Sequence, residues 1–443
     1  MSPDATPMPG ASDDLARQVA STLIVTGWFI GNGNDAMEQH RLAVFGGTPA
    51  FETPLHVGRP VISEREQFQQ RLDAVLDRQW LTNQGQETLE FERRVAEIAQ
   101  TEHCVAMASG TAALSLAAHG LGLEGEVIMP SLTFIATAHA LAWQGITPVF
   151  ADVDPVTLSV DPDHVAALVT SRTTGILGVH LWGMPCDVVG LQQVADRHGL
   201  KLFYDAAHAF GVSTQGKMLG GFGDAEVFSF HATKFVNAAE GGAVVTNDGE
   251  LADRLRLTRN FGFSGIDTVS CLGTNAKMNE LCAALGNASL AGMPAVVACN
   301  RAHMEIYRQE LAGLAGVRLL VPSKSGEHNH QYVIVLVNAS VTGISRDDMI
   351  QVFNRENVLA RRYFYPGCHR QEPYCRDSDR GDQLPITERV VAQCMALPTG
   401  PSLSADDVRT VCRIFRQAIQ QATEVRKQLA VPLNTGSGIC GAE

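Results

Sequence analysis

The sequence lacks an excess of positive charge. Of its 443 residues, 47 are Asp or Glu and 34 are Lys or Arg, which gives a formal net charge of −13. This balance argues against nucleic acid or an anionic membrane surface as the main partner, and nothing in the chain resembles a DNA-binding helix pair with a basic face. We therefore expect neither nucleic acid nor membrane as a partner. An anionic ligand has to be bound by local hydrogen-bond donors.

The ten cysteines lack a regular spacing. No two of them form a Cys-x-x-Cys pair, which argues against both a zinc site and a disulfide framework. Scattered cysteines favour reduced thiols, as in the cytoplasm. We therefore predict no metal site and a cytoplasmic location.

The N-terminal region lacks a long hydrophobic run. The apolar stretch at 21–31 is too short to span a bilayer, and no basic segment precedes it as in a signal peptide. Residues 1–14 are rich in Pro, Asp and Ala, which predicts disorder. We interpret residues 1–40 as an N-terminal extension and residues 431–443 as a tail.

The chain does contain a regular succession of buried-strand patterns. Apolar runs alternate with helical stretches, which predicts an α/β fold with a mostly parallel sheet and helices on both faces. The seven predicted strands span 104–109, 126–131, 147–153, 173–180, 201–207, 225–230 and 242–247. From about residue 330 the pattern changes, which predicts a large domain at 41–295 and a smaller C-terminal α+β domain at 296–430.

An acid and a lysine follow the ends of two predicted strands. Asp205 ends the apolar run that begins at Lys201, and Lys234 lies shortly after the run that ends at Phe230. A pyridoxal phosphate enzyme needs this pair, because a lysine forms the Schiff base and an acid keeps the pyridinium nitrogen protonated. Taken singly, such residues are more often turn caps or solvated side chains. The small and aromatic neighbours of Lys234 favour the catalytic interpretation.

A glycine turn opens a helix after the first predicted strand. Ser109, Gly110 and Thr111 lead into an alanine- and leucine-rich helix at Ala112. Free N–H groups at a helix start suit a phosphate monoester. We therefore predict that Gly110, Thr111 and Ala112 hold the phosphate of the cofactor. The alternative is an ordinary helix capped by Ser109 or Thr111.

Three segments resemble a known family. They are Asp205-Ala206-Ala207-His208-Ala209-Phe210-Gly211, Ser229-Phe230-His231-Ala232-Thr233-Lys234 and Glu240-Gly241-Gly242. They are similar to the pattern of the DegT/DnrJ/EryC1/StrS sugar aminotransferases, and the resemblance runs from about Arg41 to Gln421. It implies a fold-type I pyridoxal phosphate transferase with a seven-stranded sheet. Family members in which histidine replaces the lysine are dehydratases, so Lys234 implies an aminotransferase.

The resemblance also implies further cofactor contacts. His208, counted as catalytic with Asp205 and Lys234, would bond the phenolic oxygen of the cofactor or pack on its ring. Phe134 would stack on the ring, and Ser229 would bond the phosphate. Asn275 matches an asparagine that reaches the phosphate of the neighbouring subunit, which implies a homodimer with shared active sites. By themselves these positions suggest a structural histidine, a core phenylalanine and a turn asparagine.

Two clusters are candidates for substrate binding. Thr82 and Asn83 lie on a polar loop that suits sugar hydroxyls, and capping of the next helix is the alternative. Arg361, Tyr365 and His369 belong to a basic and aromatic cluster. It suits a nucleoside diphosphate, since arginine forks match phosphate and rings stack on a base. The alternative here is surface arginines beside a packed strand.

The reaction is likewise implied by the resemblance. It is the transfer of an amino group from an amino acid, L-glutamate in the family, to a nucleotide-linked keto sugar. Segments 80–86, 273–280 and 361–369 look most like the branch that aminates dTDP-4-keto-6-deoxy-glucose at C4. The alternatives are amination at C3 of a dTDP-3-keto-6-deoxy sugar and a pyridoxal-fold sensor without turnover.

Overall fold

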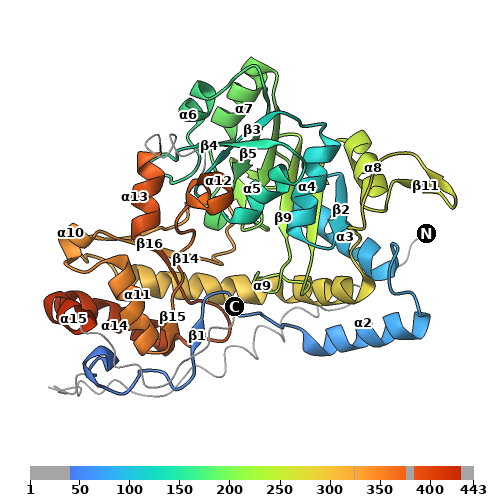
Figure 1. Cartoon of the computed structure of the whole chain (residues 1–443). Helices are drawn as coiled ribbons and strands as arrows, with labels where there is room; N and C mark the ends of the chain where they lie inside the picture. The colour runs from blue at the N-terminus through green and yellow to red at the C-terminus, as the bar shows by residue number, and fades with distance from the viewer. Residues whose placement is uncertain (1–39, 324, 376–383, 431–443) are drawn as a thin grey trace, which may run out of the picture. The chain divides into compact units, whose positions relative to one another are not determined.

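A seven-stranded sheet lies at the centre of the chain (Figure 1). In this computed structural model, residues 40–323, 325–375 and 384–430 are described. The strand order is β2-β10-β9-β6-β5-β3-β4. Only β10 runs antiparallel to its neighbours within this sheet. The strands are β2 (His103–Met107), β3 (Glu126–Pro130), β4 (Thr147–Ala151), β5 (Thr173–Val179), β6 (Lys201–Asp205), β9 (Ala225–Ser229) and β10 (Gly242–Thr246). All seven predicted strands are confirmed, and each ends slightly earlier than predicted.

Helices cover both faces of this sheet, because successive strand residues point to opposite sides. In β10, Val244 packs in a core with α4, α5 and α8. Its neighbours Ala243 and Val245 pack on the other side with α3. The bounds are α3 (Gln86–Ala99), α4 (Gly110–Gly120), α5 (Ile135–Ala142), α7 (Val188–His198) and α8 (Gly249–Thr258). The predicted α/β class is therefore confirmed.

The C-terminal part has a core of its own. An antiparallel sheet of β13 (Val317–Leu319), β14 (Val333–Val337) and β16 (Cys394–Leu397) packs with α11 (Arg346–Arg355) and α14 (Ala405–Gln420). This antiparallel sheet with its helices matches the predicted smaller α+β part.

The remaining α-helices and strands are spread along the chain. They are β1 (Leu55–His56), α2 (Arg65–Arg78), α6 (Pro162–Ala167), β7 (Ser213–Thr214), β8 (Lys217–Met218), β11 (Phe263–Gly265), β12 (Thr268–Val269), α9 (Glu280–Glu310), α10 (Ala339–Thr342), β15 (Val358–Leu359), α12 (Glu372–Cys375), α13 (Pro385–Gln393) and α15 (Ala422–Leu429). Short 3-10 helices are η2 (Ala43–Phe45), η3 (Leu181–Gly183) and η4 (Cys368–Arg370).

The long helix α9 belongs to both cores. Its Ala283 packs beside the large sheet, whereas its Met304 and Tyr307 pack in the C-terminal core. The predicted domain boundary at 295 thus falls inside one helix. Leu42 and Val44, counted with the large domain in the prediction, also pack in the C-terminal core. The two domain ranges stay a prediction. Apart from His40, the predicted N-terminal extension and the tail lie outside the described residues.

Among the described residues, α9 is also the helix that is long and apolar enough to cross a membrane. Half of its most apolar window is buried within the structure. The helix packs against α2, α3 and α14. This packing is typical of a core helix, whose apolar surface is covered by other parts of the protein.

Candidate active site

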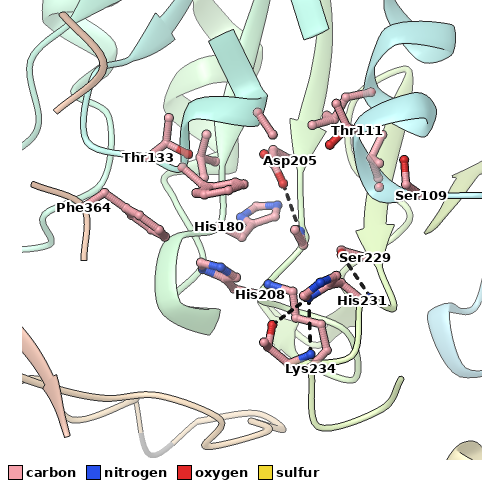
Figure 2. Close-up of a pocket in the computed structure, with 18 of the residues that line it drawn as sticks. Ser109, Thr111, Thr133, His180, Asp205, His208, Ser229, His231, Lys234 and Phe364 are labelled. Carbon is pink, nitrogen blue, oxygen red and sulfur yellow. Dashed lines mark hydrogen bonds between the residues drawn. The ribbon is translucent and has the colours of Figure 1, made fainter. Parts of the chain in front are cut away.

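A cavity of about 320 Å³ opens at the carboxyl ends of β5, β6 and β9, beside the start of α4 (Figure 2). This volume suits a small ligand. The carboxyl ends of parallel strands meet at one edge of a sheet, so residues far apart in the sequence converge there. The predicted site residues that line the cavity are Gly110, Thr111, Phe134, Asp205, His208, Ser229, Lys234 and Arg361.

Asp205 is the last residue of β6, and only 6% of its surface is exposed. Its Oδ2 accepts a hydrogen bond from Thr137 Oγ1 at 2.8 Å, and its Oδ1 accepts one from the Ala207 N–H at 3.1 Å. Burial raises the pKa of this carboxyl, while the two hydrogen bonds and the charge of Lys234 act in the opposite direction. A buried carboxylate of this kind favours a positively charged partner, such as a protonated ring nitrogen.

Lys234 lies in the turn after β9, where its N–H donates to the His231 carbonyl at 2.8 Å. Its Nζ donates to Tyr332 Oη at 3.3 Å. Burial lowers the pKa of Lys234 to about 8, although Asp205 acts to raise it. An amine with this pKa is partly neutral near pH 7 and can therefore attack an aldehyde.

The start of α4 forms one end of the cavity. The backbone is tightly packed here, since a Cβ on Gly110 would lie 3.0 Å from Ser229 Cβ, and one on Gly242 would lie 2.5 Å from the Gly110 nitrogen. The first N–H groups of a helix have no acceptor within the helix, so with the Ser229 hydroxyl they fit a phosphate. Ala112 does not line the cavity, and its N–H donates to the N-cap Ser109 at 3.1 Å. The predicted role of Ala112 in phosphate binding stays a prediction, and in this structure its N–H is already bonded to Ser109.

Aromatic rings line the space between these groups. His208 is buried, and its Nδ1 accepts a hydrogen bond from the Trp182 N–H at 3.1 Å. Burial lowers the pKa of His208 well below its usual value, and Lys234 adds to the effect, so the ring is neutral. Phe364 stacks on His208, with centroids 5.8 Å apart, and also contacts Phe134 at 5.7 Å. Such rings suit a flat heterocycle.

Only part of the predicted basic and aromatic cluster at 361–369 lies at the cavity. Arg361 lines the cavity, but Tyr365 and His369 do not. Tyr365 is 49% exposed. His369 is buried, with its Nδ1 2.5 Å from Ser131 Oγ and its Nε2 2.7 Å from Glu388 Oε1. Tyr365 and His369 thus lie outside this cavity of the single chain, and their substrate roles stay predictions.

Thr82, Asn83 and Asn275 line a second cavity of about 900 Å³, which shares no lining residue with the first. Asn275 forms a backbone bridge with Asn260 there. One chain therefore does not bring these three residues to the cavity of Lys234. The predicted contact of Asn275 with a neighbouring subunit, and the homodimer itself, stay predictions.

The first cavity is also lined by residues that no sequence pattern singled out, among them His180, Tyr332 and Phe364. His180 directly follows β5, so the strand-end rule that singled out Asp205 could have found it. Tyr332 and Phe364 come from the C-terminal part of the chain. No local pattern marks them, because long-range packing alone brings them to the cavity.

A mostly parallel sheet, with Asp205 and Lys234 lining one cavity at the carboxyl ends of its strands, is the arrangement expected of a pyridoxal phosphate-dependent aminotransferase. More narrowly, the chain belongs to the DegT/DnrJ/EryC1/StrS aminotransferase family, whose model matches residues 62–416. The predicted family, the fold type and the enzyme class are confirmed by this match.

Several relatives match most of the chain. The dTDP-4-amino-4,6-dideoxy-D-glucose transaminase of Shigella dysenteriae is 33% identical over 367 residues, which are 83% of this chain and 100% of the relative. The GDP-perosamine synthase of Caulobacter vibrioides is 35% identical over 350 residues, which are 78% of this chain and 93% of the relative. A crystal structure of DesI in the presence of its TDP-sugar product is 51% identical, with a TM-score of 0.84. That match covers 88% of this chain and 98% of DesI.

Proposed function

We propose that the protein transfers the amino group of L-glutamate to C4 of dTDP-4-keto-6-deoxy-glucose, with pyridoxal phosphate as its cofactor. The observation that carries this proposal is that Asp205 and Lys234 line one cavity. The substrate is suggested by the relatives, since one is a dTDP-4-amino-4,6-dideoxy-D-glucose transaminase and another was crystallised with a TDP-sugar product.

The residues of the cavity fit this cofactor. Asp205 would hold the ring nitrogen, and the rings of His208 and Phe134 would pack on the cofactor. The phosphate donors would be the N–H groups of Gly110 and Thr111 and the hydroxyl of Ser229. Bound in this way, pyridoxal phosphate supplies a sink for the electrons released when the α proton of the substrate leaves.

Lys234 is the residue that moves the proton. Its Nζ takes the proton from Cα of the amino donor and later returns one in the reverse direction. This role needs a neutral amine, and the lowered pKa of about 8 provides a usable neutral fraction. Tyr332 Oη, 3.3 Å from Nζ, orients the amine.

The acceptor substrate carries a diphosphate. Arg361 at the cavity offers a fork of donors that matches phosphate oxygens. Thr82, Asn83 and Asn275 would join the site from the partner of a homodimer, which would bring the second cavity of one chain to the first cavity of the other.

The test is an assay of the purified protein with L-glutamate and dTDP-4-keto-6-deoxy-glucose, with the aminated carbon identified by NMR. We expect an amine at C4. Turnover of a dTDP-3-keto-6-deoxy sugar to a C3 amine instead would establish the alternative regiochemistry. A bound cofactor whose absorption spectrum does not respond to any amino acid would contradict the proposal.

A further inference from the structure

Arg361 differs from the adjacent Arg362 in two ways: it lines the first cavity, and it has no acidic partner among the described residues. Besides histidines, the basic residues that line the first cavity are Lys234 and Arg361. Lys234 is committed to proton transfer under the proposed function. Among the described residues, Arg361 forms no ion pair, whereas the adjacent Arg362 lies 3.6 Å from Asp347. Arg361 is therefore the cation available to an anionic ligand in this cavity.

The backbone of Arg361 is held in place. Its N–H donates to the Ala396 carbonyl at 3.1 Å, and the Ala396 N–H donates back at 2.8 Å. Its guanidinium lies 5.7 Å from the centre of the Tyr363 ring, which also lines the cavity. An arginine that starts from a fixed backbone and rests against a ring loses little freedom when it binds an anion.

The two substrates of the proposed reaction both carry negative charge. The amino acid has a carboxylate on the carbon that Lys234 deprotonates, and the nucleotide sugar has a diphosphate. The net charge of −13 gives neither of them a general attraction to the protein. Each therefore depends on a local cation when it occupies the cavity, and the two occupy it in turn.

We propose, as an inference that rests on the proposed function, that Arg361 binds a carboxylate of the amino donor as well as the diphosphate of the nucleotide sugar. One guanidinium then serves both halves of the reaction, because its planar fork matches carboxylate and phosphate alike. A consequence is that the amino acid and a nucleoside diphosphate exclude each other from the cavity.

The first half-reaction tests this inference without any sugar. Holoenzyme is mixed with L-glutamate, and the concentration dependence of the spectral change of the cofactor is measured by stopped flow. Arg361→Gln should raise the half-saturating glutamate concentration by roughly 10- to 100-fold, with a much smaller change in the limiting rate. Arg361→Lys should lie between, since it keeps the charge and loses the fork.

Arg362→Gln is the matched control. Arg362 contacts the Tyr365 ring at 5.0 Å and does not line the cavity, so its variant should match the wild type. Thermal unfolding of each variant checks that folding is intact. A glutamate dependence of Arg361→Gln equal to that of the wild type would overturn the inference and leave the proposed function standing.

Competition between dTDP and L-glutamate can be measured on the wild-type protein. Adding dTDP to wild-type holoenzyme should raise the half-saturating glutamate concentration in proportion to dTDP, without lowering the limiting rate. A lowered limiting rate at unchanged half-saturation would show simultaneous binding and contradict the inference. If wild-type holoenzyme shows no spectral change with glutamate at all, the proposed function fails, and the inference fails with it.

Discussion

The cavity has two walls of different construction. The sheet wall (Gly110, Asp205 and Ser229) consists of residues at the first or last position of a helix or strand. The C-terminal wall (Tyr332, Arg361 and Phe364) consists of residues outside the helices and strands. Backbone hydrogen bonds of the large sheet fix the first wall. In the second wall, Arg361 is bonded to Ala396 of β16, whereas Tyr332 and Phe364 are placed by packing of their rings. Under the proposed function, the sheet wall would hold the cofactor and the C-terminal wall would contact the substrates.

The largest effect is expected for Lys234→Ala. Under the proposed function, the variant loses the amine that would attack the cofactor and move the proton, so turnover should fall by roughly 10⁴-fold or more. Because the phosphate donors of the sheet wall are unchanged, the cofactor should still bind, as equilibrium dialysis would show. A variant that keeps a wild-type transamination rate would remove Lys234 from the mechanism.

Asp205→Asn removes the negative charge of this side chain on the sheet wall and keeps its shape. The amide can still accept the Ala207 hydrogen bond, but it cannot hold a protonated ring nitrogen by charge. We expect turnover to fall by roughly 10²- to 10³-fold, with no loss of thermal stability, since an uncharged side chain is easier to bury.

The control for this variant is Asp224→Asn. Asp224 bonds Lys201 Nζ at 2.9 Å at the other end of β6, and it does not line the cavity. The same chemical change there should leave turnover unaltered. Equal losses in both variants would point to a general structural effect instead of a catalytic one.

The pKa of Lys234 predicts how cofactor binding depends on pH. The folded value of about 8 lies below the ordinary value of 10.5, so the neutral fraction of the amine rises as the pH approaches 8. The rate at which apoprotein combines with pyridoxal phosphate should therefore increase roughly fivefold from pH 7 to pH 8 and level off above pH 9. Absorbance stopped flow measures it, and a rate that falls over this interval would contradict the assignment.

The smallest effect is expected for Tyr332→Phe on the C-terminal wall. The substitution keeps the ring and removes the hydroxyl that accepts from Lys234 Nζ, so turnover should fall by roughly 3- to 10-fold. The pH profile should also move to lower pH, since the charged amine loses an acceptor. A loss as large as that of Asp205→Asn would end the distinction between the two walls.

The sheet wall could be predicted from the sequence because its residues follow local patterns. Buried apolar runs marked the strands, and strand ends marked Asp205 and the region of Ser229 and Lys234. The position of Ala112 was less predictable, because its N–H bonds the Ser109 side chain, a contact that a sequence pattern allows but does not require.

The C-terminal wall could be predicted only in part. Arg361 and His369 are near neighbours in the sequence, yet one lines the cavity and the other is buried against Ser131 and Glu388. The path of a turn decides this, and composition does not reveal it. Tyr332 had no local signal at all, since its contact with Lys234 spans 98 positions of the chain.

Helix α9 connects the two cores from which the two walls of the cavity come. Its 31 residues extend for roughly 46 Å, and side chains along its length are locked into both cores. Any movement of one core relative to the other therefore has to be accommodated within α9. Pro294 lies inside the helix, where its ring removes one helical hydrogen bond, so it marks the position at which α9 can bend most easily.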